Sequence, residues 1–192
     1  MIGVDVARGG ADRNVYVTLA ETRELSVILE VRRRPCAQDT RVTLAEIRGL
    51  ADRTQATIIM DAIGFGAALI DELREAQYDV RAFDASARAE VKDRSGELSF
   101  ANLRAAGWWT LRERLDPMSK LKPLALPPDD YVVGDLTAPR WHRQTTGIQI
   151  EAKDEIRKRL GRSTDVGDAI VHALSGPLLK EPYDPIMYPH FY

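Results

Sequence analysis

An acidic residue inside the first apolar run is the feature that most constrains how this chain can fold. Residues 2–8 read Ile-Gly-Val-Asp-Val-Ala-Arg, a run typical of a strand buried in a sheet, and they include Asp5. A carboxylate near a strand interior is costly to desolvate unless something compensates its charge. Two interpretations are open. Asp5 lies at a sheet edge or pairs with an arginine, or it is a metal ligand on a central strand. The second requires acidic partners from later in the chain.

Length and composition limit the class of protein. With 192 residues, of which 44% are hydrophobic and 29% charged, the chain predicts one compact α/β domain. No apolar run approaches the ~20 residues that cross a membrane, and no basic-then-apolar leader is found. Cys36 is the only cysteine, which excludes an internal disulfide and a cysteine-rich zinc site. We therefore expect a cytoplasmic protein without membrane contact. The net charge of −2 leaves nucleic-acid binding open.

The order of strand and helix patterns predicts the sheet. Two β-branched runs, residues 14–20 and 25–31, follow the first strand and predict an antiparallel meander. A helix, a buried strand over residues 57–60, a second helix and a strand over 79–83 complete a β-β-β-α-β-α-β order. Helical crossovers make the later strands parallel to the first. This order matches the ribonuclease H-like arrangement, an α/β fold with a mixed five-stranded sheet of order 3-2-1-4-5, flanked by helices.

The second half of the chain predicts further helices and one hairpin. The expected elements are helices over residues 100–115, 129–136 and 151–160, a hairpin of 140–144 with 148–151, and a last helix from about Asp165. No internal repeat or interior linker interrupts this series. We therefore expect a single domain over residues 1–180 and a C-terminal tail over 181–192.

Three acids fall at matching positions of this predicted fold. Asp5 lies on the first strand, Asp61 ends the fourth, and Asp168 lies in the first turn of the last helix. Parallel first and fourth strands place Asp5 and Asp61 side by side at one sheet edge. Mg²⁺ and Mn²⁺ take oxygen ligands of this kind, and two ions ~4 Å apart can activate water and stabilise the leaving oxygen of a phosphodiester. Each acid alone is more often structural, but the three together indicate a metal site.

Other residues near these acids leave alternatives open. Asp165, at the start of the last helix, serves equally well as a cap for free amides or as a metal ligand. His172 continues the same helix face, and we expect it to be exposed. The turn Asp61-Ala-Ile-Gly64-Phe-Gly66 can admit a phosphate to backbone amides, or it is only a tight turn. We expect Trp108 and Trp109 to pack against other residues rather than stack on bases.

Basic residues are concentrated between residues 140 and 162. Two acid-first pairs at helical spacing, Asp154 with Lys158 and Glu155 with Arg159, are expected to stabilise a solvated helix. The cations left without a partner are better candidates for phosphate contacts, and they are Lys153, Arg157 and Arg162.

Motifs in a fixed order resemble a known family. In chain order they are Gly3-Val-Asp-Val-Ala-Arg8, the turn 61–66, Phe100-Ala-Asn-Leu-Arg-Ala-Ala-Gly-Trp-Trp109, Leu126-Pro127, Asp135-Leu-Thr-Ala-Pro139, Glu151-Ala-Lys-Asp154, Arg159-Leu-Gly-Arg-Ser163 and Asp165-Val-Gly-Asp-Ala169. Together they are similar to the C-terminal nuclease domain of the large terminase subunit of tailed bacteriophages and prophages. The resemblance covers nearly the whole chain, from Gly3 to about Ala173.

This resemblance implies a ribonuclease H-like fold and a metal-dependent endonuclease. Such a nuclease cuts concatemeric double-stranded DNA when genome packaging starts and ends. The family's acids map onto Asp5, Asp61 and Asp168, with Asp165 as an auxiliary ligand, and the segment 140–151 matches a hairpin beside the active site. By this reasoning Asp5 bridges two Mg²⁺ or Mn²⁺ ions, Asp61 holds one of them, and Asp168, with or without Asp165, holds the other.

The resemblance also implies partners and a location. They are double-stranded DNA, the ATPase domain, the small terminase subunit and the portal, in the bacterial host cytoplasm at the procapsid. The sequence has no G-x-x-x-x-G-K-[ST] phosphate loop, so we expect an excised nuclease domain that does not hydrolyse ATP.

Three alternatives to a terminase nuclease are considered. Another ribonuclease H-like nuclease, acting on four-way junctions or on RNA hybrids, keeps the fold but changes the substrate. An actin-like nucleotide-binding domain also has an aspartate on its first strand, but this chain is too short for the duplicated domain. An inactive prophage remnant would act only as a docking module, and the intact set of acids argues against it.

Overall fold

The sheet places the acidic first strand at its centre. The computed structural model describes residues 1–7, 12–36 and 39–179. The main sheet contains β1 (Ile2–Asp5), β2 (Arg13–Glu21), β3 (Ser26–Pro35), β4 (Ile58–Asp61), β5 (Val80–Phe83) and β6 (Leu124–Ala125), in the order β5-β4-β1-β2-β3-β6. Strand β1 pairs antiparallel with β2 and parallel with β4. The predicted mixed sheet is therefore confirmed, as is the predicted order of the first five strands.

A sixth short strand extends the sheet beyond the predicted five. Strand β6 pairs in parallel with the start of β3, where Leu124 lies opposite Ser26. It contains only two residues, and prolines at positions 123 and 127 stand close on either side. A segment this short has no alternation of apolar and polar residues, so the sequence pattern could not separate it from a loop.

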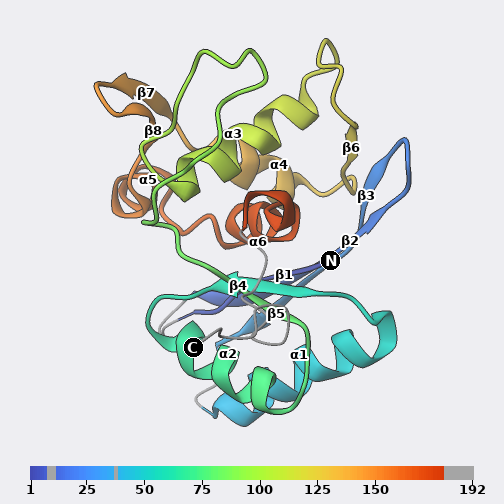
Figure 1. Ribbon diagram of the computed structural model, residues 1–192. Coiled ribbons are helices and arrows are strands. Elements are labelled where there is room, and N and C mark those ends of the chain that lie inside the picture. Colours follow the sequence, from blue (N-terminus) through green and yellow to red (C-terminus); the bar gives the residue numbers. More distant parts are fainter. Residues whose placement is uncertain (8–11, 37–38, 180–192) are drawn as a thin grey trace, which may run out of the picture.

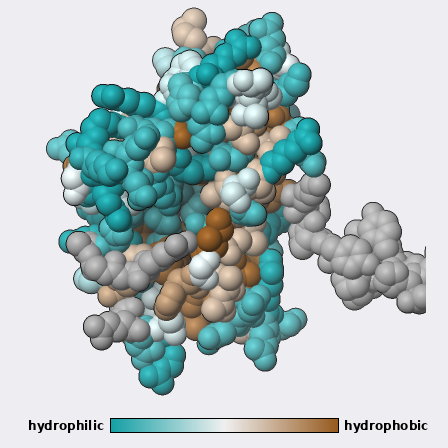
Figure 2. All heavy atoms as spheres, turned by 90° about the vertical axis from the view of Figure 1, so that its left-hand side faces the viewer, coloured by the Kyte–Doolittle hydropathy of each residue, from teal (hydrophilic) through white to brown (hydrophobic). Residues whose placement is uncertain are grey.

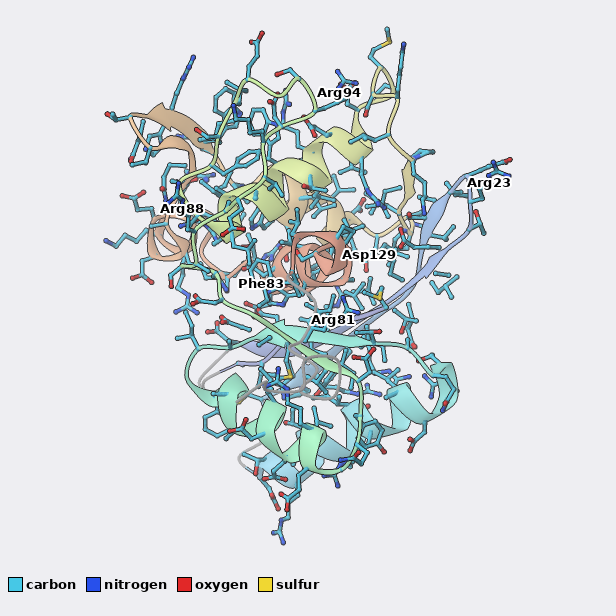
Figure 3. All side chains as sticks on the ribbon, viewed as in Figure 1. Arg23, Arg81, Phe83, Arg88, Arg94 and Asp129 are labelled. Atoms are coloured by element: carbon cyan, nitrogen blue, oxygen red, sulfur yellow. The ribbon has the colours of Figure 1, made fainter. Side chains whose placement is uncertain are left out.

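Helices cover both faces of the sheet (Figure 1). Helices α1 (Thr40–Thr54) and α2 (Phe65–Glu75) lie below it in this view, and α6 (Asp165–Leu174) lies above it with α3 (Leu103–Leu115) and α4 (Asp130–Thr137). Ile2 and Val4 belong to the buried cluster that includes residues of α1 and α2. Successive residues of a strand point to opposite faces, so Gly3 and Asp5 face α6. Phe83 is also on the α6 side, as Figure 3 shows, and its ring centroid lies 4.8 Å from that of His172.

Gly3 allows α6 to lie directly on β1. A Cβ atom at this position would be 2.0 Å from the carbonyl oxygen of Ala169 and 2.5 Å from the backbone nitrogen of Ala173. No side chain fits there without displacing the helix. Because Ala169 follows Asp168, the same close contact brings Asp168 over the strand that carries Asp5.

The remaining elements lie beyond the sheet. They are a hairpin of β7 (Trp141–Gln144) and β8 (Gly147–Ile150), helix α5 (Lys153–Leu160) and the 3₁₀ helix η1 (Gly176–Leu178). The predicted hairpin is confirmed, and β8 leads through two residues into α5. Within the described residues, none of the helices combines the length and apolarity needed to cross a membrane. The predicted tail, 181–192, lies outside the described residues, so the single domain over 1–180 stays a prediction.

The close contact at Gly3 yields a stability test. We expect Gly3→Ala to lower the free energy of unfolding by at least 1–3 kcal/mol, the usual cost of overpacking, because the clash is with backbone atoms. Gly49→Ala is the matched control. Gly49 lies in α1 with nothing within 4 Å of its added Cβ, so alanine should stabilise the protein by about 0.5–1 kcal/mol. Urea unfolding of both variants measures the difference, and equal stabilities would refute the proposed packing.

Candidate active site

Two of the predicted acids meet at one edge of the sheet. Asp5 ends β1 and Asp61 ends β4, and these strands are parallel neighbours in which Val4 lies opposite Met60. The same register places Asp5 opposite Asp61. In Figure 1 the start of β1 is marked N on the right, so β1 and its parallel neighbour β4 both end towards the left of the sheet, on the side of α5. The side-by-side arrangement expected from parallel strands is therefore observed.

Helix α6 adds two more acids from above the sheet. Asp168 is buried, with 3% of its surface exposed, and one ammonium group contacts both it and Asp5: Lys153 Nζ lies 3.1 Å from Asp168 Oδ2 and 4.0 Å from Asp5 Oδ1. Asp165 lies one turn before Asp168, and its Oδ2 accepts a hydrogen bond from the Arg13 amide at 3.3 Å. The charges of Asp168, Asp165 and Asp61 all act on Asp5, so the four carboxylates form one electrostatic unit.

The acid cluster opens onto a cleft of about 610 Å³. Its lining includes Asp5, Asp61 and Asp165 together with Lys153 and Arg157. Exposed apolar side chains, those of Ile63 and Phe65, contribute to the same lining. Figure 2 shows the side of the molecule towards which these strand ends point: hydrophilic residues dominate its upper part, and apolar residues gather below them. The cleft therefore combines acidic, basic and apolar groups.

Burial gives the carboxyl group of Asp5 an unusual pKa. Loss of hydration is the largest cause. Together with the charges of Asp168, Asp165 and Asp61 it raises the pKa to about 7, against the attraction of the Lys153 ammonium. For Asp168 burial acts in the same direction, but Lys153 and Arg104 outweigh it and lower the pKa. Asp168 is closer to Lys153 than Asp5 is, and it also has Arg104 beside it, so the pKa values of the two buried acids shift in opposite directions.

Lys153 is not the free cation that the sequence predicted. Its ammonium group lies between two buried carboxylates, and their charges hold the pKa of Lys153 above its ordinary value despite burial. Helical spacing within α5 could not reveal this, because Asp5 and Asp168 come from distant parts of the chain. Lys153 supplies a positive charge inside the acid cluster, and its predicted contact with DNA stays a prediction.

The other two predicted DNA contacts also have partners. Arg157 pairs with Asp12, and Arg162 pairs with the fully buried Asp135. Arg157 lines the cleft, whereas Arg162 is not among the lining residues. Both contacts with DNA remain predictions, but the premise that these cations are unpaired is wrong.

The expected pairing of Arg159 with Glu155 within α5 is not observed. Arg159 binds the carboxylate of Glu151 and the carbonyl oxygen of Ala138, so its acid lies before the helix and not at Glu155. A pairing rule confined to one helix does not include the residues that come before it.

Asp135 takes the capping role that was one interpretation of Asp165. The backbone amides of Val166 and Gly167 donate to Asp135 Oδ2 at 2.9 and 3.3 Å. The N-cap position itself is Thr164, whose side chain makes no capping hydrogen bond. Asp165 therefore does not cap the helix, and it lines the cleft. In the sequence, Asp135 stood out only because it begins Asp135–Pro139, one of the motifs that resemble the terminase family. That motif gave no indication of its capping role.

Three further residues around Asp168 were missed or misjudged. The indole Nε1 of Trp108 donates to Asp168 Oδ1 at 3.2 Å, and Arg104 Nε lies 3.9 Å from the same oxygen. Trp108 and Trp109 are buried, so the packing prediction is confirmed but incomplete. His172 is buried rather than exposed, and its Nδ1 donates to the Val4 carbonyl oxygen at 2.7 Å. Burial lowers the pKa of His172, which favours the neutral ring. The error arose because His172 follows the acids on a helix face that is covered by the sheet.

The carboxylates are grouped but do not form a closed metal cage. Among the described residues, no group of three or more His, Cys, Asp or Glu side chains is arranged so that it could hold an ion. The Lys153 ammonium lies between Asp5 and Asp168 instead. A divalent cation would have the right ligand chemistry here, because all four candidates are carboxylates, but it would have to compete with this ammonium group.

Comparison with known proteins identifies the fold. The chain is similar to the nuclease domain of the large terminase subunit gp2 of bacterial virus Sf6, with a TM-score of 0.70, 20% sequence identity and coverage of 89% of this chain and 85% of that one. For the large terminase nuclease of thermophilic phage G20c, solved with bound magnesium, the TM-score is 0.60, the identity 20% and the coverage 91% and 79%. For the Thermus phage P74-26 large terminase nuclease domain the values are 0.56, 18%, 95% and 82%.

At these sequence identities the likeness establishes the fold alone. The predicted ribonuclease H-like fold is confirmed. No protein-family model matches the chain, and no curated protein sequence matches it. The similarity is therefore one of fold, in the arrangement of strands and helices.

The raised pKa of Asp5 predicts a pH-dependent stability. An acid whose folded pKa exceeds its unfolded value near 4 binds more protons in the native state, so stability falls as pH rises from about 4 to about 7. We expect Asp5→Asn to stabilise the metal-free protein at pH 8 by on the order of 1–3 kcal/mol, with a smaller gain at pH 5. Urea unfolding at both pH values in chelator measures this, and a gain that does not change with pH would contradict it.

Proposed function

We propose that this chain is a metal-dependent DNA endonuclease, the nuclease domain of a large terminase subunit that cuts concatemeric double-stranded phage DNA during packaging. The observation that supports it most is the convergence of four acids, of which Asp5, Asp61 and Asp165 line one cleft. Asp5 and Asp61 come from adjacent parallel strand ends, and Asp165 and Asp168 come from the helix above them. This convergence occurs on the fold of terminase nuclease domains.

The site fits divalent cations by its chemistry. Asp5, Asp61, Asp165 and Asp168 would hold Mg²⁺ or Mn²⁺, and we propose that two ions share the four carboxylates. Burial of Asp5 near three other acids raises its pKa to about 7, which indicates that negative charge at this site is only partly compensated. When bound, the ions would supply positive charge beside the phosphate that is cut.

The chain's own residues bind and orient the substrate. A phosphodiester in the cleft would lie beside Arg157, whose side chain is half exposed. An exposed ion pair contributes only about 0–1 kcal/mol, so Arg157 can exchange Asp12 for a phosphate at little cost. Lys153 lowers the pKa of Asp168 and opposes the burial that raises the pKa of Asp5. Contacts of this kind read the DNA backbone and predict weak sequence preference.

The proposed assignment places the chain in a larger assembly. Its partners would be double-stranded DNA, an ATPase domain, the small terminase subunit and the portal, in the host cytoplasm. The sequence contains no G-x-x-x-x-G-K-[ST] motif, so we expect this chain to cut DNA without hydrolysing ATP.

A plasmid nicking assay tests the metal-dependent activity. We expect cleavage with Mg²⁺ or Mn²⁺, none in excess chelator, and a rate for Asp61→Asn that is lower by roughly 100-fold or more, because loss of a metal ligand should exceed the usual 10–100-fold effect of its outer-shell partners. The matched control is Asp71→Asn, since Asp71 is an exposed acid on α2 outside the cleft lining. Full activity in chelator, or normal cutting by Asp61→Asn, would refute the proposed mechanism.

The salt dependence of binding tests the role of Arg157. Each phosphate contact contributes about 0.9 to the slope of log affinity against log salt. We expect Arg157→Ala to reduce the slope for duplex DNA by about that amount. Lys158→Ala is the control, because Lys158 is the next residue of α5, is exposed and does not line the cleft. Fluorescence anisotropy with a labelled duplex measures both slopes, and equal losses would indicate a diffuse charge effect instead of a specific contact.

A further inference from the structure

The indole of Trp108 lies against the helix that carries Asp168. Trp108 is buried on α3, and its Nε1 donates to Asp168 Oδ1 at 3.2 Å. Its ring covers the backbone at Gly167, where an added Cβ would lie 2.5 Å from Trp108 Cη2. The ring therefore contacts α6 at the residue immediately before the acid. Both its position and its hydrogen bond are directed at Asp168.

The two oxygens of Asp168 have different surroundings. Oδ1 faces α3, where it accepts from Trp108 and lies 3.9 Å from Arg104 Nε. Oδ2 faces Lys153, at 3.1 Å, and Thr164, whose hydroxyl donates at 3.4 Å. Arg104 and Trp108 are four residues apart, so they lie on one face of α3. This face of α3 holds Oδ1 of Asp168, and Oδ2 points to the Lys153 ammonium group at the cleft.

We infer that Trp108 is a positioning residue, whose indole N–H fixes the carboxylate of Asp168 so that Oδ2 is available to a cation. This inference rests on the proposed metal-dependent function. An indole N–H is only a donor, so this bond holds Oδ1 as its acceptor and fixes the orientation of the carboxylate. A phenylalanine could fill the same space but would leave Oδ1 without this donor.

The adjacent tryptophan provides an internal comparison. Trp109 is equally buried, but its Nε1 donates to Glu113 of the same helix at 3.1 Å. Its ring contacts Trp141 of the hairpin edge-on, with centroids 5.1 Å apart, and Arg112 lies over it. Trp109 therefore joins α3 to the hairpin and contacts none of the four acids by these interactions. Two neighbouring residues of the same type thus have separable roles.

Calorimetric titration with Mn²⁺ of Trp108→Phe and Trp109→Phe tests the inference. Outer-shell hydrogen bonds are typically worth 10–100-fold in metal affinity. We expect Trp108→Phe to lose affinity for Mn²⁺ by about that factor, and the Mn²⁺ concentration for half-maximal plasmid nicking to rise in parallel. Trp109→Phe should bind Mn²⁺ as the unsubstituted protein does, within about twofold, even if packing against the hairpin is weakened. Circular dichroism checks that both variants fold.

A second measurement does not depend on the folding of Trp108→Phe. In ¹⁵N-labelled protein without that substitution, Mg²⁺ should shift the indole N–H resonance of Trp108 and leave that of Trp109 nearly unchanged. Normal Mn²⁺ affinity in Trp108→Phe, an equal loss in Trp109→Phe, or an unmoved Trp108 resonance would each overturn the positioning role. If the unsubstituted protein bound no Mn²⁺ at all, the proposed function itself would fail, which is a distinguishable result.

Discussion

The contact between β1 and α6 is the constraint on which the site depends. Because Gly3 has no side chain, the backbone of α6 lies directly on the central strand, and the acids of that helix come down beside the one on the strand. The start of α6 is held by Asp135, a fully buried acid that accepts two helix amides and pairs with Arg162. One glycine and one buried acid, neither in the cleft lining, thus decide where Asp168 lies.

The charges of Asp5, Asp168 and Lys153 do not compensate one another fully, and this lowers the stability of the metal-free protein. Asp5 and Asp168 are both buried, and Lys153 is the cation that contacts each of them in the described structure. A buried acid with a pKa near 7 lowers the stability of the metal-free protein at neutral pH. Binding of a cation only by the folded form would recover that stability by mass action. The position of Asp5 in an apolar run already indicated that burying its carboxylate costs free energy. That cost is consistent with a site that binds a cation.

Sequence patterns were sufficient for the sheet but not for the surroundings of its acids. Strand alternation and helical spacing predicted the order of strands and helices along the chain. The match of that order to the ribonuclease H-like arrangement predicted the order of five strands in the sheet, and the parallel first and fourth strands predicted the place of Asp5 beside Asp61. They missed β6, which is too short to show a period. They also treated Lys153 as free and His172 as exposed, because pairing rules within one helix take no account of partners from distant segments. The contact of Trp108 with Asp168 spans 60 residues, and only the packing of α3 on α6 reveals it.

We propose that Asp5, Asp61, Asp165 and Asp168 together bind divalent cations at the cleft. The most direct test is a crystal structure of the protein soaked in Mn²⁺, with anomalous diffraction recorded at the manganese edge. We expect anomalous density between these carboxylates, with the Lys153 ammonium displaced from its place between Asp5 and Asp168. Well-ordered crystals at saturating Mn²⁺ that show no anomalous density at these four side chains would contradict it.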